Sequence, residues 1–163
     1  MASTKQKSSG AQLNEREIAA WRGLLKAHSQ LVATLDEELE REHGIPLGSY
    51  EVLLHLNDAP DGSLRMGDLA DRLLLSRSGL TRLIDRLVSR DVVERHSCPD
   101  DRRGTYARLT PDGKRLLDTA RPTHLRGVRE HFLDHLGDGD LDRLGEIWER
   151  VTTASPADGT SCG

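Results

Sequence analysis

The chain has 163 residues, a formal net charge of −4, and 36% hydrophobic and 31% charged residues. These values predict one domain, or one compact unit with a small subdomain, that has a modest core and a highly charged surface. They exclude a membrane-spanning protein, since no segment approaches the roughly 18 apolar residues of a membrane helix, and the first residues lack the apolar stretch of a secretory signal. Two cysteines, Cys98 and Cys162, are too few for a disulfide framework, so we expect a cytoplasmic protein.

The first predicted element is a long helix from about Asn14 to about His43. Asn14 and Glu17 have the spacing of a capping box, and Gly44 supplies the C-terminal stop. One face of this helix carries residues that recur at helical spacing, and most of them are apolar. They are Ile18, Trp21, Leu24, Leu25, His28, Leu31, Val32, Leu35 and Leu39.

A group of short elements follows. We expect a helix from Leu47 to about Leu56, which ends before the turn signal at 58–62, a short extended piece at Ser63 to Arg65, and a helix from Met66 to Leu73. The next helix is capped by Ser76 or Ser78 and runs to about Arg90. Its apolar positions predict a core face, and they are Leu80, Leu83, Ile84, Leu87 and Val88. Its opposite face is polar and largely cationic, and consists of Arg77, Ser78, Thr81, Arg82, Asp85, Arg86 and Ser89.

The second half of the chain begins with a predicted hairpin. Its strands are Val92 to Cys98 and Thr105 to Leu109, around a loop at 99–104. Thr110 caps the following helix, which Pro122 should kink or break before it resumes towards Leu136. A last helix after the turn at 137–140 carries an apolar stripe made of Leu141, Leu144, Ile147, Trp148 and Val151.

The distribution of charge singles out the middle of the chain. Residues 1–64 carry a net charge of −4, residues 65–108 carry +3, and residues 109–163 carry −3. A helix with hydroxyls and arginines near its start, followed by an arginine-tipped hairpin, can read a groove of double-stranded DNA and contact the flanking phosphates. We therefore expect a DNA-binding face on an otherwise acidic protein.

The ends of the chain predict a second copy as partner. We expect disordered tails at 1–12 and 154–163, a DNA-binding region at 46–110, and helical dimerisation regions at 13–45 and 111–153. The apolar stripes of the terminal helices have few partners within one subunit, so a homodimerisation layer is their natural use. A twofold dimer would place two recognition helices in successive major grooves, about 34 Å apart.

Several motifs resemble the MarR family of winged helix-turn-helix regulators. The most specific is Asp101-Arg102-Arg103, followed after five residues by Leu109-Thr110, which is similar to the D-x-R and L-T wing signature of that family. Gly113, Leu69-Ala70 and the segment 81–87 agree further, and the resemblance spans about Asn14 to Val151. It implies a mainly α (α+β) fold with a winged helix-turn-helix DNA-binding lobe, and a homodimeric repressor of a pseudo-palindromic operator.

The resemblance assigns roles to individual residues. It implies that Arg103 enters the minor groove, that Asp101 orients Arg103 by a charge-assisted hydrogen bond, and that Arg102 meets phosphate or the groove edge. The recognition-helix set comprises Ser76, Arg77, Ser78, Thr81, Arg82 and Arg86. The competing interpretation is that the arginines of this helix merely solvate an exposed face, with Asp85 paired locally. Arg95 and Arg108, on the strands, are assigned a structural or phosphate-steering role.

The family resemblance also implies a small aromatic or phenolic anion as effector, bound between the dimerisation helices and the DNA-binding lobe. The residues that could supply stacking surface, donors and positive charge there are Trp21, Arg22, His28, Tyr50 and His55. The alternative for each of them is packing in the core.

Other functional classes were weighed against this one. His131 and His135, at i and i+4, with Glu42-His43, leave a metal-responsive regulator open, although we assign no metal ligand and no cofactor. Cys98, beside the cationic wing and near His96, leaves a redox-responsive regulator open. A winged-helix protein-interaction module without DNA binding is a further alternative. The chain lacks a glycine-rich phosphate loop, HExxH and G-x-S-x-G, so we do not expect an enzyme.

Overall fold

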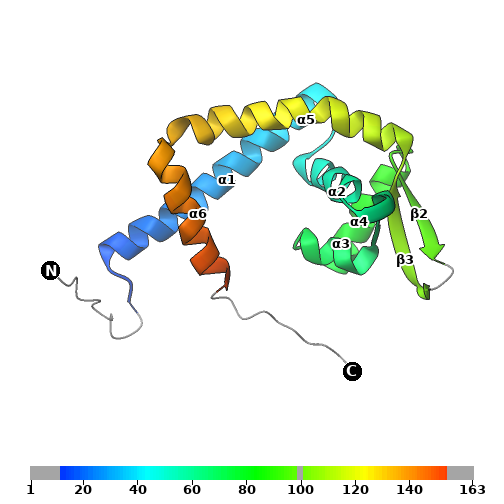
Figure 1. The fold of residues 1–163 in the computed structure, drawn as a ribbon, viewed down its shortest axis with the longest axis horizontal. Coiled ribbons are helices and arrows are strands. Elements are labelled where there is room, and N and C mark those ends of the chain that lie inside the picture. Colours follow the sequence, from blue (N-terminus) through cyan, green and yellow to red (C-terminus); the bar gives the residue numbers. More distant parts are fainter. Residues whose placement is uncertain (1–11, 99–100, 154–163) are drawn as a thin grey trace.

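The computed structural model describes residues 12–98 and 101–153. The chain forms a winged lobe, residues 47–109, and a helical arm that extends away from it (Figure 1). The arm consists of the N-terminal half of α1 (Glu15–His43), the C-terminal half of α5 (Pro111–His131) and α6 (Asp138–Thr153). The C-terminal half of α1 packs against the C-terminal half of α5, with contacts from Thr123 to Glu42 and from His131 to Glu38.

The winged lobe contains α2 (Leu47–Asn57), α3 (Met66–Arg72) and α4 (Arg77–Val88), with a 3-10 turn at Pro60–Gly62. Its sheet consists of β1 (Ser63–Arg65), β2 (Val93–Cys98) and β3 (Asp101–Leu109), in the antiparallel order β1-β3-β2. The largest side chains of its core that are almost fully buried share an apolar or aromatic character. They are Tyr50, Val52, Leu53, Leu56, Leu69, Leu80, Ile84, Leu87 and Val93. The predicted core face of α4 is therefore confirmed, as is the short strand β1.

The ends of α1 follow the predicted local chemistry. The side chain of Asn14 accepts a hydrogen bond from the Glu17 backbone N–H at 3.0 Å, and Glu17 accepts one from the Asn14 N–H at 2.8 Å. Gly44 ends the helix in the left-handed conformation, with φ 64°. Leu35 and Leu39 are buried, whereas the first four turns of the helix carry no buried residue.

The junction between β3 and α5 depends on a close backbone approach. The Thr110 hydroxyl accepts a hydrogen bond from the Gly113 N–H at 3.0 Å, and the same hydroxyl donates to the Asp91 carbonyl at 2.7 Å. A Cβ at Gly113 would lie under 3.0 Å from the backbone carbonyl oxygen of Val92. Glycine at this position therefore lets the start of α5 lie directly on the start of β2.

The second half of the chain differs from the prediction in three places. Pro122 does not break α5, which runs unbroken from Pro111 to His131. The proline ring is exposed, so water can satisfy the carbonyl oxygen that loses its donor. The helix also ends before Leu136, because a 3-10 turn at Leu133–His135 follows it. Finally, β3 begins at Asp101 rather than Thr105, because Cys98 pairs with Asp101 across a bulge in the hairpin.

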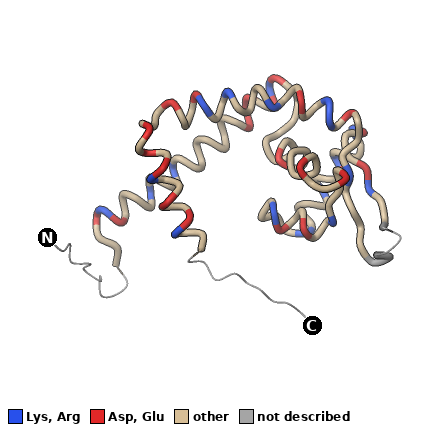
Figure 2. Tube along the Cα trace, in the orientation of Figure 1, with Lys and Arg blue, Asp and Glu red and all other residues tan. Residues whose placement is uncertain are grey.

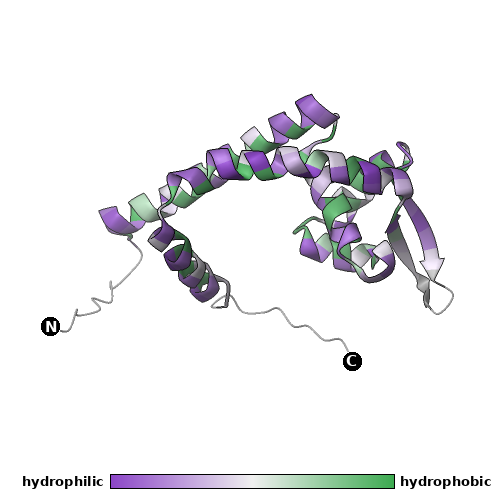
Figure 3. Cartoon of the chain, turned by 45° about the horizontal axis from the view of Figure 1, so that its top comes forward, coloured by the Kyte–Doolittle hydropathy of each residue, from purple (hydrophilic) through white to green (hydrophobic). Residues whose placement is uncertain are grey.

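Some predicted features lie outside the residues that the structure describes. The predicted tails lie beyond the described residues, apart from the exposed Gln12, and so does the hairpin tip at 99–100. Within 12–98 and 101–153, no helix is both long and apolar enough to cross a membrane. Figure 3 shows apolar positions alternating with polar ones along α1 and α6, although α6 buries none of its side chains within the chain.

Candidate nucleic-acid interface

The helix-turn-helix is set up by a strained turn and a serine cap. Leu74, between α3 and α4, has a positive φ of 52° and is 93% exposed. Ser76 then caps α4, since its hydroxyl accepts a hydrogen bond from the Gly79 N–H at 3.1 Å. Of the two predicted caps, Ser76 is therefore the one used. Leu80, one turn later, is buried and fixes the rotation of the helix against the core.

The rotation of α4 turns its polar face outward. The predicted recognition-helix side chains are all exposed, and they are Ser76, Arg77, Ser78, Thr81, Arg82 and Arg86. Thr81 donates its hydroxyl proton to the Arg77 carbonyl at 2.8 Å, so an outside partner would find an acceptor there. Figure 2 shows basic positions in the winged lobe, on α4 and on the hairpin strands. The described part of α4 thus exposes every side chain of the predicted recognition-helix set.

The hairpin next to α4 is held by polar contacts. The His96 Nε2 lies 2.8 Å from the Ser63 hydroxyl, and the His96 ring stacks on Tyr106 with centroids 5.5 Å apart. Arg108 lies 3.8 Å from Glu94 in an exposed ion pair. These contacts connect all three strands, so the body of the hairpin is fixed relative to β1.

Arg95 connects the hairpin to α4. Its Nη1 donates to the Asp85 Oδ1 at 2.5 Å, and its Nη2 donates to the Thr81 carbonyl at 3.2 Å. The partner of Asp85 therefore comes from β2 and not from its own helix. No periodic pattern indicates this contact, since the two residues belong to different elements.

A cavity of about 390 Å³ lies between α3, α4 and the hairpin. Its lining residues come from all three parts, and they are Met66, Gly67, Arg77, Leu80, Thr81, Arg95 and Thr105. The hollow separates the start of the recognition helix from the outer half of the hairpin. Side chains from two sides can therefore approach one outside partner without first packing against each other.

The wing residues are placed only by their backbone. Asp101, Arg102 and Arg103 lie in β3, next to the hairpin tip, and Cys98 ends β2. Their side chains lie outside the described part of the chain. The predicted roles of these arginines, and the redox alternative at Cys98, therefore remain predictions.

The five predicted effector residues do not gather in one place within the described chain. Trp21 is 55% exposed and lies about six turns before His43, or about 33 Å along the helix axis. Arg22 and His28 are also exposed on the arm. Tyr50 is 2% exposed in the lobe core, and His55 is half-buried further along α2. The described chain therefore does not bring these five residues together by itself, because the length of α1 separates the two groups, and their role in binding an effector remains a prediction.

Tyr50 instead belongs to a buried contact between α2 and α5. Its ring lies 4.5 Å from that of His124, at an interplanar angle of 33°. Burial raises the pKa of Tyr50, while the positive charge of Arg121 acts to lower it. Burial lowers the pKa of His124. The sequence analysis missed His124, whose position on α5 has no motif that distinguishes it.

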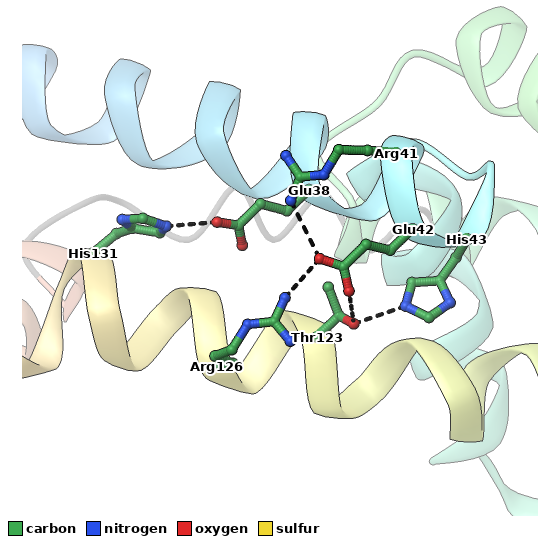
Figure 4. Close-up of polar contacts among 7 residues, drawn as sticks. All are labelled: Glu38, Arg41, Glu42, His43, Thr123, Arg126 and His131. Atoms are coloured by element: carbon green, nitrogen blue, oxygen red, sulfur yellow. Dashed lines mark hydrogen bonds and ion pairs between the residues drawn. The ribbon is translucent and has the colours of Figure 1, made fainter.

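A polar seam joins α1 to α5 and was also missed (Figure 4). The Thr123 hydroxyl donates to Glu42 at 2.9 Å, so the His43 Nε2–H, 2.8 Å away, must donate to Thr123. Arg126 donates to the other oxygen of Glu42 at 2.7 Å. The hydrogen bond from Thr123, followed by those from the two neighbouring arginines, outweighs burial and lowers the pKa of Glu42.

The histidines weighed for metal binding are divided between different elements. His131 ends α5, and its Nε2 lies 2.7 Å from Glu38 of α1. His135 lies in the 3-10 turn, so the predicted i, i+4 pair on one helical face was wrong. Ligand atoms of Glu38, Glu130 and His131 lie within 4.8 Å of one another. The hydrogen bond between His131 and Glu38 brings these atoms together and joins the two helices.

Comparisons with known proteins agree with this geometry. A sequence model of the MarR family matches residues 43–104. The HTH-type transcriptional repressor YetL of Bacillus subtilis (strain 168) is 30% identical over 112 residues, covering 67% of each chain. AbsC, a MarR family transcriptional regulator from Streptomyces coelicolor, superposes with a TM-score of 0.83 at 32% identity, covering 88% of this chain and 97% of AbsC.

A second Streptomyces coelicolor structure, that of the MarR family regulator Sco3205 in complex with DNA, is 35% identical. It has a TM-score of 0.82 and covers 86% of this chain and 92% of Sco3205. These relatives are regulators, which confirms the expectation that the chain is not an enzyme. Their similarity extends over both the winged lobe and the arm. The chain therefore belongs to the MarR family of transcriptional regulators.

Proposed function

We propose that the protein binds double-stranded DNA through α4 and the hairpin, as a homodimeric repressor of a pseudo-palindromic operator. The observation that carries this proposal is the outward face of α4, where exposed arginines and hydroxyls lie beside the hairpin with a hollow between them. A recognition helix enters the major groove with its first residues nearest to the bases, while a neighbouring wing follows the backbone. The DNA complex of Sco3205 supports the proposal by similarity.

The base-reading residues are proposed from their place on α4. Arg77, Ser78, Thr81 and Arg82 lie in the first two turns, where side chains reach base edges, and Arg86 lies one turn further towards the phosphates. Arg103 is proposed to enter the minor groove, with Asp101 orienting it and Arg102 on the backbone. The last three assignments rest on the sequence motif alone.

The proposed dimer uses the arm. Large apolar side chains are exposed along it, and they are Leu13, Trp21, Leu24, Leu25, Val32, Leu125, Leu141, Trp148 and Val151. Exposed apolar surface on this scale is typical of a protein interaction site when the side chains form one patch. A second copy of the chain is the proposed occupant, because pairing the terminal helices of two subunits buries both sets at once and gives the twofold symmetry of a palindromic site.

We further propose that a small aromatic anion releases the DNA. Trp21, Arg22 and His28 all lie on the arm, on or beside the surface proposed for the second copy. A ligand there would therefore contact both subunits. Such a ligand can change the separation of the two recognition helices, which is the distance that operator binding needs.

Salt-dependent binding to DNA tests the proposal. Fragments selected from genomic DNA by the purified protein supply the operator, and fluorescence anisotropy compares it with random duplex over a range of salt concentrations. The affinity should fall linearly on a log–log scale, with a slope of about −0.9 for each phosphate neutralised. Arg82→Ala should weaken operator binding by about tenfold or more and reduce its preference over random duplex.

Matched variants test the contribution of the wing separately from that of α4. Arg103→Ala should weaken operator binding severely while the protein stays dimeric, and Arg16→Ala, an exposed arginine of the arm, should bind as the wild type does. Binding that does not weaken as salt rises would remove DNA recognition from the function. A full operator preference in Arg82→Ala would make that residue a surface or phosphate contact.

A further inference from the structure

One acidic side chain lies on the face of α4 that is proposed to meet DNA. Within Arg77–Val88 the acidic residue is Asp85, which is exposed one turn after Thr81 and next to Arg86. A carboxylate facing the phosphate backbone repels it, so an uncompensated Asp85 would oppose binding. The structure provides a partner for this carboxylate.

That partner is Arg95, which donates hydrogen bonds to two points on α4. One guanidinium nitrogen donates to the Asp85 carboxylate at 2.5 Å, and the other donates to the Thr81 backbone carbonyl at 3.2 Å. The two acceptors are one helical turn apart, so a planar fork on both of them fixes the position of the strand along the helix as well as its distance. A lysine carries a single nitrogen and cannot reproduce this geometry.

The position of Arg95 along the hairpin explains why this contact can orient the wing. At the base of β2, Val93 is buried against the lobe core, so apolar packing holds the strand there. Two residues further along, on the same face of the strand, Arg95 borders the cavity that separates the hairpin from α4. The two hydrogen bonds from the Arg95 guanidinium therefore lie between the base of the hairpin, which apolar packing holds, and its tip.

We propose that Arg95 is a positioning residue for DNA recognition, which sets the angle between α4 and the wing and neutralises Asp85 on the DNA-facing surface. This inference rests on the proposed function in DNA binding. Arg95 does not itself read bases or neutralise a phosphate in this arrangement, because both ends of its fork are engaged within the protein. Its contribution to affinity passes through Asp85, Thr81 and the wing.

A double-mutant cycle in DNA binding tests this role. Arg95→Ala should weaken operator binding by about tenfold and reduce the preference over random duplex, because Asp85 is left uncompensated and the wing loses its register. Asp85→Asn alone should have a smaller effect, and Arg95→Ala with Asp85→Asn should bind more tightly than Arg95→Ala alone. Arg95→Lys, which keeps the charge without the fork, should recover affinity for random duplex but not the full operator preference.

The control is Arg115→Ala, which removes an exposed arginine of α5 that pairs with Asp112 rather than with α4. It should keep the operator preference, and thermal unfolding should show all variants folded, since a half-exposed ion pair contributes little to stability. The inference is overturned if Arg95→Ala lowers the salt slope by about one without any rescue by Asp85→Asn, since Arg95 would then be a phosphate contact. If the wild type shows no salt-dependent DNA binding, the proposed function and this inference both fail.

Discussion

The winged lobe and the helical arm differ in how much of their apolar surface they bury within the chain. The lobe encloses its apolar side chains within one chain, and Tyr50, Leu69 and Ile84 are almost fully buried there. The arm buries few of its own, and Trp21, Leu25 and Trp148 are exposed. Apolar burial is the main favourable term in folding, so the lobe supplies much of its own core, whereas the arm leaves exposed the apolar side chains that the proposed second copy would cover. The proposed functions of DNA binding and dimerisation thus fall on different parts of the chain.

The largest predicted effect comes from a charged side chain placed on the arm. Trp21→Glu should raise the dissociation constant of the dimer by at least about a hundredfold, because two carboxylates would enter an apolar interface. The lobe should remain folded, since Trp21 contributes nothing to its core. Sedimentation equilibrium measures the dimer, and circular dichroism measures the fold.

A matched charge on the lobe is the control. Leu74 is even more exposed, at 93%, but lies in the helix-turn-helix turn. Leu74→Glu should leave the dimer intact. A dimer that dissociates in Leu74→Glu and persists in Trp21→Glu would reverse the roles of the two regions.

Two glycine substitutions, with a smaller predicted effect, compare the packing of the lobe with that of the arm. Gly113→Ala should destabilise the protein by about 1–3 kcal/mol, because its Cβ would collide with the Val92 carbonyl and backbone cannot move aside cheaply. Gly139→Ala, in α6 of the arm, meets no atom within 4 Å in the described structure and should be close to neutral. Thermal unfolding of both variants gives the measurement. Equal losses of stability would mean that the arm is packed as tightly as the lobe.

Local chemistry explains the features that the sequence predicted well. Asn14, Glu17 and Gly44 act through neighbours within four residues, so the ends of α1 could be read directly. The same holds for Ser76 at the start of α4 and for Thr110 at the start of α5. The outward face of α4 followed from its period, because the apolar positions that turn inward determine the polar ones that turn outward.

Non-local contacts explain what could not be predicted. Arg95 and Asp85 meet across two elements, and Glu42 meets Thr123 across 81 positions of sequence, so no spacing rule applies to either pair. The early start of β3 depends on pairing with β2 rather than on turn residues. The candidate effector residues were chosen by residue type, and their spacing did not indicate that the length of α1 separates those of α1 from those of α2 in the described chain.

The smallest effect that we predict comes from His124, at the joint between α5 and the lobe. Its ordinary pKa is 6.5, and burial against Tyr50 lowers it in the folded protein, so the neutral form is favoured there. The unfolded chain therefore binds the proton more readily below about pH 6.5, and the stability that His124 contributes is present above that value and is lost as the pH falls. The Tm should drop by a few degrees between pH 7.5 and 5.5, on the order expected for one group.

This pH effect should stay within the lobe. His124→Phe keeps a ring against Tyr50 and removes the titration, so part of the drop in Tm should disappear, while the dimer dissociation constant of the wild type should change little over the same range. Differential scanning calorimetry and sedimentation equilibrium at the two pH values separate the two quantities. An unchanged drop in His124→Phe would place its source elsewhere. A dimer that dissociates at pH 5.5 would show instead that the effect of pH reaches the arm.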